Sequence, residues 1–112
     1  PMARRKFDSS GNIQETHAVY AQIIRDVAKE NKVLLIDMSE ISKSLLQKLG
    51  PKGSVFLYNH LEPGEHPNYP DGKIDDTHFS ELGARRLAEL VLAEIRIVAP
   101  ELASRIVVRA DK

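Results

Sequence analysis

The chain has 112 residues, enough for one small domain with its own hydrophobic core, and we treat residues 1–112 as that single domain. Its 16 basic and 16 acidic side chains cancel, which argues against nucleic acid and anionic membranes as partners. The absence of cysteine excludes disulfides and thiolate metal sites. No apolar run approaches the ~20 residues that span a bilayer, and no signal-type segment opens the sequence. We therefore expect a soluble chain.

The first residues are expected to finish a buried strand. Met2 and Ala3 are apolar, and Arg4 and Arg5 follow where that strand would end. Open α/β sheets bind ligands at this edge, so both arginines are candidates for substrate binding. The alternative is that they are ordinary solvated cations. The polar stretch 8–12 that comes next predicts a turn.

The middle of the chain alternates between helical and strand patterns. Apolar residues at helical spacing predict a helix over Thr16–Glu30, with Thr16 as its N-cap. The short apolar run Val33–Ile36 is typical of a parallel strand covered on both faces. Asp37 is expected to cap the next helix, although a residue at the end of a strand can also belong to a site. That helix is predicted over Ser39–Leu49 and closed by a Gly-Pro pair. This order predicts a crossover unit of an α/β fold.

Residues 52–73 form a long stretch rich in proline and glycine. Connections of that length inside a compact domain are usually functional or disordered. We expect this one to form a wall of a substrate cleft, with Asn68 and Tyr69 as rim contacts. The apolar run 55–58 inside it fits a short helix or a short strand.

Several residues in and after this stretch could be suspected of binding a metal. No pair of them has the i, i+4 spacing of a helical zinc motif, and a loop interrupted by prolines does not preset metal geometry. We expect no metal and no cofactor. The residues considered are His60, Glu62, His66, Asp71, Asp76 and His78.

Asp75 and His78 lie three residues apart, just before a helix predicted over Ser80–Val98. If Asp75 accepts the Nδ1 proton of His78, Nε2 is left as a base, and the pair forms two thirds of a nucleophilic triad. The alternative is that both residues only cap and decorate the start of the helix.

The predicted last helix has Ser80 as its N-cap and more apolar surface than one buried stripe needs. We expect part of that surface to pack on something that the chain lacks. Residues 101–108 fit either one more helical turn or an extended tail. The expected stripe comprises Ala84, Leu87, Ala88, Val91, Ile95 and Val98, and the second apolar face comprises Leu90, Leu92 and Ile97.

Four stretches together carry a family resemblance: residues 3–8, Thr16-His17 with Tyr20, residues 63–72, and Asp75–Ala84. They resemble the SGNH (GDSL-like) hydrolases, in particular the branch similar to rhamnogalacturonan acetylesterases, and only the carboxyl-terminal half of such enzymes. The resemblance implies part of a three-layer α/β/α sandwich with parallel strands that lacks its amino-terminal half.

The resemblance also implies a serine esterase. Asp75 and His78 match the carboxyl-terminal members of a Ser-His-Asp triad, whereas the Gly-Asp-Ser block of the nucleophile and the Gly and Asn of the oxyanion hole are not found. The run Asp8-Ser9-Ser10-Gly11 is superficially similar to the nucleophile block, but we interpret it as a turn.

The expected substrate is an acetylated carbohydrate of the pectin or rhamnogalacturonan kind, or another small ester. We expect the chain to be inactive alone, and to self-associate or to pair with the missing half. It would be secreted or periplasmic if that half carries an export signal. The alternative from a different class is a non-catalytic α/β module for binding or assembly.

Overall fold

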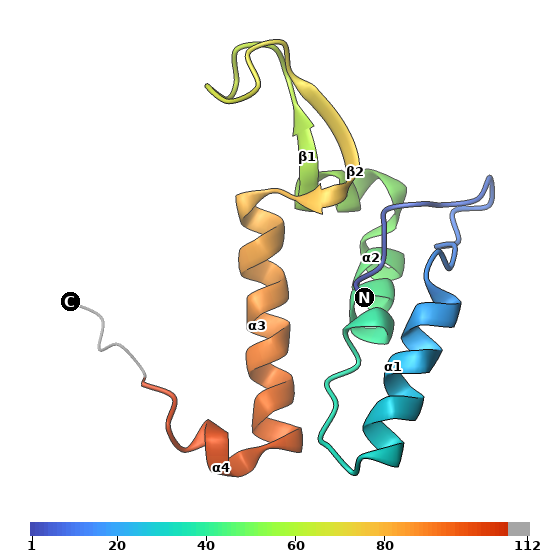
Figure 1. Ribbon diagram of the computed structural model, residues 1–112. Helices are drawn as coiled ribbons and strands as arrows, with labels where there is room; N and C mark the ends of the chain where they lie inside the picture. The colour runs from blue at the N-terminus through green and yellow to red at the C-terminus, as the bar shows by residue number, and fades with distance from the viewer. Residues whose placement is uncertain (108–112) are drawn as a thin grey trace.

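The computed structural model describes residues 1–107 (Figure 1). Three long helices lie side by side, and a β-hairpin projects beyond the ends of two of them. None of the described helices is long and apolar enough to cross a membrane. In chain order the elements are α1 (Ala18–Glu30), α2 (Met38–Gly53), the 3-10 helix η1 (Ser54–Leu57), β1 (Tyr58–Leu61), β2 (Lys73–Phe79), α3 (Glu81–Val98) and α4 (Pro100–Ala103).

Helix α1 begins at Ala18, and its N-cap is His17 rather than the predicted Thr16. The Thr16 hydroxyl is instead 2.9 Å from Nδ1 of His17. The Glu15 carboxylate accepts the backbone N–H groups of Thr16 and His17, each at 3.1 Å. The carboxylate therefore binds the two N–H groups just before the helix, and no side chain caps the first turn of α1 itself.

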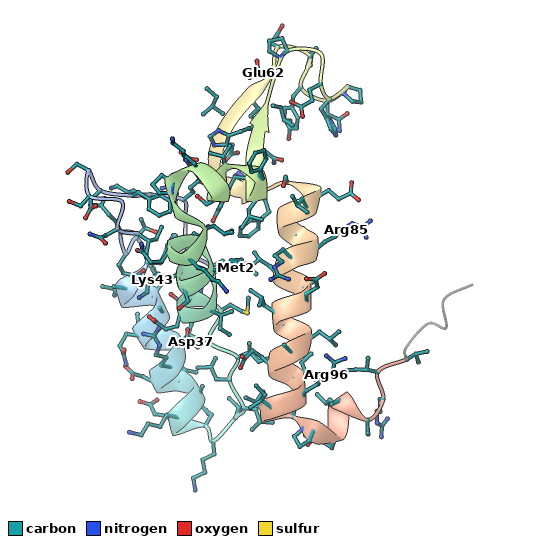
Figure 2. All side chains as sticks on the ribbon, turned by 180° about the vertical axis from the view of Figure 1, so that it is seen from behind. Met2, Asp37, Lys43, Glu62, Arg85 and Arg96 are labelled. Carbon is teal, nitrogen blue, oxygen red and sulfur yellow. The ribbon has the colours of Figure 1, made fainter. Side chains whose placement is uncertain are left out.

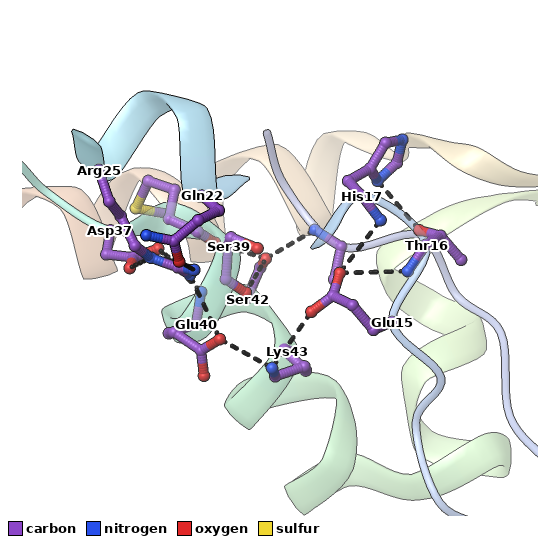
Figure 3. A network of polar contacts seen from close by, with 12 residues as sticks. Glu15, Thr16, His17, Gln22, Arg25, Asp37, Ser39, Glu40, Ser42 and Lys43 are labelled. Carbon is purple, nitrogen blue, oxygen red and sulfur yellow. Dashed lines mark hydrogen bonds and ion pairs between the residues drawn. The ribbon is translucent and has the colours of Figure 1, made fainter. Parts of the chain in front are cut away.

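Asp37 caps α2 as predicted, because its carboxylate accepts the backbone N–H of Glu40 at 3.2 Å. The same carboxylate lies 2.6 Å from Nε of Arg25, which ties α1 to α2. Lys43 extends this network by pairing with Glu15 and Glu40 (Figure 3). The helical φ/ψ angles stop at Gly50, which has a φ of 68°, and a last turn follows the kink.

The predicted strand at Val33–Ile36 is absent, and this prediction was wrong. The side chains of Val33 and Leu34 are 59% and 67% exposed. Within residues 1–107 the sheet consists of β1 and β2, and these pair antiparallel. An extended segment becomes a strand only when a neighbouring strand pairs with it, and no described segment forms a ladder with residues 33–36. The described part of the chain therefore mixes helices and strands without parallel strands or a three-layer sandwich.

A small core lies where the amino-terminal segment, α2, η1 and β1 meet. Ala3 was expected to end a strand, but its N–H donates to the Ser42 hydroxyl at 2.8 Å instead. The Tyr58 hydroxyl donates to the carbonyl oxygen of Ala3 at 2.7 Å, and its ring lies 4.9 Å from that of Phe79. The core fixes the base of the hairpin. It comprises Ala3, Leu46, Leu57 and Tyr58, with Phe7, Ile13, Leu45 and Phe79 packed against them.

Much apolar surface outside this core remains uncovered. On α3, Leu87 is buried, but Ala84 and Ala88 of the predicted stripe are exposed. The chain exposes 8276 Å², whereas a folded monomer of its mass exposes about 6,200 Å². Much of the predicted apolar surface of α1 and part of that of α3 is therefore uncovered among residues 1–107. On α1 the exposed apolar residues are Val19, Tyr20, Ile23, Ile24 and Val27.

The stretch 52–73 is more ordered than predicted, since it contains the end of α2, all of η1 and β1, and the first residue of β2. The run 55–58, which fitted a helix or a strand, forms most of η1 and the first residue of β1. After α3, the helical alternative is found in α4, while Val108 lies outside the described residues.

Candidate active site

Asp75 and His78 lie at an irregularity of the hairpin. Tyr58 pairs with Phe79, but its neighbour Asn59 pairs with Asp75. Residues 76–78, here called the bulge, consequently face no partner on β1. Bulges re-aim side chains and are common beside active sites. Here the bulge turns the chain into Ser80, whose hydroxyl accepts the N–H of Gly83 and caps α3.

The Asp75 carboxylate organises this turn from within. One oxygen, Oδ1, accepts the backbone N–H of Thr77 at 2.8 Å and that of His78 at 3.0 Å. The other oxygen, Oδ2, lies 2.8 Å from Nδ1 of the His78 ring. The contact expected between Asp75 and His78 is thus present. Neither residue caps α3, because the cap is Ser80 and the N–H groups that Asp75 accepts belong to β2.

These hydrogen bonds keep Asp75 ionised. The backbone N–H of His78, then that of Thr77, then the His78 ring hold the pKa of the Asp75 carboxyl well below its usual value. A carboxylate can only accept a hydrogen bond, so Nδ1 of His78 must carry the proton in this contact, and Nε2 of the neutral ring is left with a free lone pair.

The two side chains differ sharply in exposure. Asp75 is 12% exposed, whereas His78 is 75% exposed. A fixed carboxylate behind an accessible imidazole is the geometry of a general base held by its orienting group. No serine or threonine hydroxyl in residues 1–107 hydrogen-bonds to the His78 ring. The described residues thus bring a carboxylate and an exposed imidazole together, and no hydroxyl group among them contacts the ring.

Arg4 and Arg5, predicted as substrate contacts, both bind the bulge. Nε of Arg4 donates to the Thr77 hydroxyl at 2.9 Å, and Nη1 of Arg5 donates to Oδ1 of Asp76 at 2.9 Å. Arg4 is exposed, whereas the Arg5 side chain is only 17% exposed. Both arginines therefore bind residues that directly precede His78 in the sequence. The donors of Arg5 are already used in contacts inside the protein.

Asn68 and Tyr69 lie in the loop at the far end of the hairpin. Figure 2 labels Glu62 at this end, away from the helices. Asn68 is exposed and its backbone N–H donates to His66, with no hydrogen bond to His78, so the structure does not bring Asn68 and His78 together. Tyr69 is closer to the site, since Nζ of Lys73 lies 4.7 Å from its ring centre and 3.7 Å from Oδ2 of Asp75.

Sequence reasoning missed two parts of the site. The position of Lys73 beside Asp75 could not be predicted, because a lysine at the start of a strand is common and does not indicate a site. Asp76 binds His60 of β1, with 2.7 Å between Nε2 and Oδ1, and the sequence had offered both only as metal ligands. No group of three possible metal-binding side chains is found in residues 1–107.

Comparison with known proteins gives one informative match. The chain is 41% identical over 109 residues to the rhamnogalacturonan acetylesterase RhgT of Bacillus subtilis (strain 168). The match covers 97% of this chain and 47% of that protein. No family model matches the chain. No solved structure matches it significantly.

The chain therefore spans about half the length of the curated relative it matches. The aligned region contains almost every residue of this chain, which agrees with a resemblance carried by four separate stretches. The recognition made from the sequence is confirmed: over nearly its whole length, this chain is related to a rhamnogalacturonan acetylesterase.

Proposed function

We propose that this chain is the carboxyl-terminal half of an SGNH-type carbohydrate acetylesterase, and that it supplies the Asp and His of a Ser-His-Asp triad. The observation that carries this proposal is the 2.8 Å contact between Asp75 Oδ2 and His78 Nδ1, in which an ionised carboxylate orients an exposed imidazole. The relationship to a rhamnogalacturonan acetylesterase supports the same reaction class.

In the proposed mechanism, Nε2 of His78 takes the proton of a serine hydroxyl supplied by the other half of the enzyme. The serine oxygen attacks the acetyl carbonyl carbon, and oxyanion-hole donors from that half stabilise the tetrahedral intermediate. When this intermediate collapses, the sugar oxygen leaves and receives the proton from the imidazolium. Water, activated by the same Nε2, then releases acetate from the acyl-enzyme. Asp75 stabilises the imidazolium during both steps.

The substrate proposed is an acetylated pectin-like carbohydrate. Asn68 and Tyr69 are its proposed contacts from the hairpin loop. Tyr69 borders a hollow of about 530 Å³ at the base and side of the hairpin, and a concave site of that size suits a few sugar units. Arg4 is a third candidate, because its side chain is exposed beside Thr77.

We propose that the uncovered apolar surfaces receive the other half of the enzyme. A groove of about 760 Å³ between α2 and α3, here called the apolar groove, is lined largely by leucine and other apolar residues. The exposed run at Val33 and Leu34, which lies outside this groove, would gain a strand partner from the same half, and a parallel sheet would then form. The apolar residues of the groove are Ile41, Leu45, Leu49, Phe56, Leu57, Leu82 and Leu90.

The test is esterase activity with and without a completing half. The portion of the Bacillus subtilis relative that this chain does not match is joined ahead of Pro1, and the chimera is compared with the 112-residue chain on a chromogenic acetate. The chain alone should hydrolyse the acetate no faster than buffer. The chimera should hydrolyse it, and His78→Ala should lower that activity by several powers of ten.

Three results would contradict the proposal. Activity of the chain alone that disappears with His78→Ala would mean that it holds its own nucleophile. A chimera whose activity is indifferent to His78→Ala would remove the Asp75–His78 pair from the mechanism. A chimera that folds and is inactive would favour the non-catalytic binding or assembly module.

A further inference from the structure

The bulge depends on groups outside the hairpin, because β1 offers residues 76–78 no partners. Asp75 satisfies the N–H groups of Thr77 and His78 from within. The carbonyl oxygen of Asp76, by contrast, accepts the backbone N–H of Arg5 at 2.9 Å. The amino-terminal segment thus replaces the missing strand partner at the middle of the site.

The Arg5 guanidinium spreads over three acceptors from separate parts of the fold. Nη1 donates to Asp76 Oδ1 at 2.9 Å, Nε donates to the Ser54 hydroxyl at 3.2 Å, and Nη2 donates to the Pro51 carbonyl oxygen. Ser54 is 0% exposed and lies where α2 passes into η1. Arg5 therefore ties the bulge to a buried junction, and only a planar fork of donors fits this arrangement.

The Asp76 carboxylate receives a second donor from the neighbouring strand. Nε2 of His60 on β1 lies 2.7 Å from the same Oδ1 that binds Arg5. Two adjacent aspartates consequently each contact one imidazole, and the two imidazoles differ in exposure. Asp75 contacts an exposed ring, whereas Asp76, which also binds Arg5, contacts the His60 ring, which is 21% exposed.

We infer that Arg5 and Asp76 are positioning residues, which fix the orientation of the His78 imidazole by anchoring the bulge. This assignment rests on the proposed function and changes the role expected of Arg5, since its donors are used inside the protein and not for substrate. A displacement of about 1 Å at a catalytic base can cost about 10²-fold in rate, so an anchor of this kind has a catalytic consequence without touching the substrate.

The test measures the ring itself by ¹⁵N NMR of the 112-residue chain. In the wild type, His78 should be the Nδ1–H tautomer when neutral, because Asp75 accepts that proton. Arg5→Lys keeps the charge, but one ammonium cannot reach three acceptors, so the neutral ring should shift to comparable populations of both tautomers. Asp76→Asn should give the same shift. The matched control is Arg85→Lys, in an exposed pair with Glu81 on the side of α3 away from α2 (Figure 2).

A ring that keeps the Nδ1–H tautomer in both variants would overturn the inference, even if thermal stability falls, because it would show a structural role only. Should Arg5→Lys fail to fold, Asp76→Asn decides, since it preserves the shape of the side chain. The NMR result does not depend on catalysis. An active His78→Ala chimera would refute the proposed function and leave the anchor intact, whereas an unshifted ring would refute the anchor alone.

In the chimera, Arg5→Lys should lower kcat by about 10- to 100-fold, while KM for a small acetate stays unchanged. An unchanged kcat would also overturn the inference, because an anchor of the base must act on the chemical step.

Discussion

Gly83, in the first turn of α3, is the point where this helix touches the backbone that leads to the site. A Cβ built at Gly83 would lie 2.0 Å from the carbonyl oxygen of Leu57 and 2.9 Å from its Cα. That oxygen also accepts the backbone N–H of Ser80 at 3.0 Å, two residues after His78. We therefore predict that Gly83→Ala destabilises the protein, although alanine is the better helix former.

The magnitude follows from the required shift. Real Cβ atoms stay at least 3.0 Å from such atoms, so α3 and Leu57 must separate by about 1 Å. Overpacking of this kind costs about 1 to 3 kcal/mol, and loss of the Ser80–Leu57 hydrogen bond adds about 1 kcal/mol. Alanine propensity returns at most about 1 kcal/mol. The expected net loss in the free energy of unfolding is about 2 kcal/mol, or about 8 °C in Tm.

The assay is thermal and urea unfolding of the chain followed by circular dichroism. Gly53→Ala is the matched control, because a Cβ there would meet Leu49 Cβ at 3.4 Å, an ordinary contact. It should leave the free energy of unfolding unchanged or raise it by less than about 1 kcal/mol. If Gly83→Ala were as stable as Gly53→Ala, the close packing of α3 on Leu57 would be refuted.

Three further changes test other parts of the fold. Burial raises the pKa of Tyr58 to about 12. The neutral phenol therefore contributes stability that is complete below an unfolded pKa of about 10 and is lost as the pH rises towards 12. The free energy of unfolding of Tyr58→Phe should consequently fall less steeply at alkaline pH than that of the wild type. Asp37→Ala removes a helix cap and the Arg25 ion pair and should cost about 1 to 2 kcal/mol in urea unfolding, whereas a loss near zero would show that the cap is unimportant. Leu49→Glu places a charge in the apolar groove; if that groove drives self-association, analytical ultracentrifugation should show a smaller species than the wild type, and an unchanged distribution would exclude it.

The helices were predictable because their signals are local. Asp37 and Ser80 cap α2 and α3 through N–H groups three residues later, so each start could be read from a short window. The end of regular helical geometry at Gly50 was equally local. The predicted Thr16 cap is not formed, because the Thr16 hydroxyl contacts Nδ1 of His17 instead, and such side-chain positions are not encoded in the spacing of residue types.

The strand could not be predicted in the same way, because a strand is defined by its neighbour. Val33–Ile36 has strand composition, yet no described segment pairs with it as a strand. The hairpin, by contrast, is formed although its sequence does not have strand composition throughout. It was hidden in a stretch with proline and glycine, where Gly64 and Gly72 at positive φ turn the chain back so that Lys73 pairs with Leu61.

The site likewise combines local contacts, which could be predicted, with contacts between distant residues, which could not. Asp75 and His78 are three residues apart, so their contact followed from one turn of chain. The contact of Arg5 with Asp76 spans 71 residues and depends on the fold bringing the amino terminus to β2. Sequence reasoning placed Arg5 near the site for a different reason, the end of a strand that is not formed.

The most direct test of the central claim is a double-mutant cycle on Asp75 and His78 in the chimera, measured as kcat/KM for a chromogenic acetate. Asp75→Asn removes the acceptor for the Nδ1 proton and should cost up to about 10⁴-fold, the loss that serine proteases show when the corresponding aspartate becomes asparagine. If Asp75 acts through His78, the double variant Asp75→Asn with His78→Ala should be no slower than His78→Ala alone, because residues of one catalytic unit are not additive. Costs that multiply, or an Asp75→Asn variant as fast as the wild type, would contradict the claim that these two side chains work as one base.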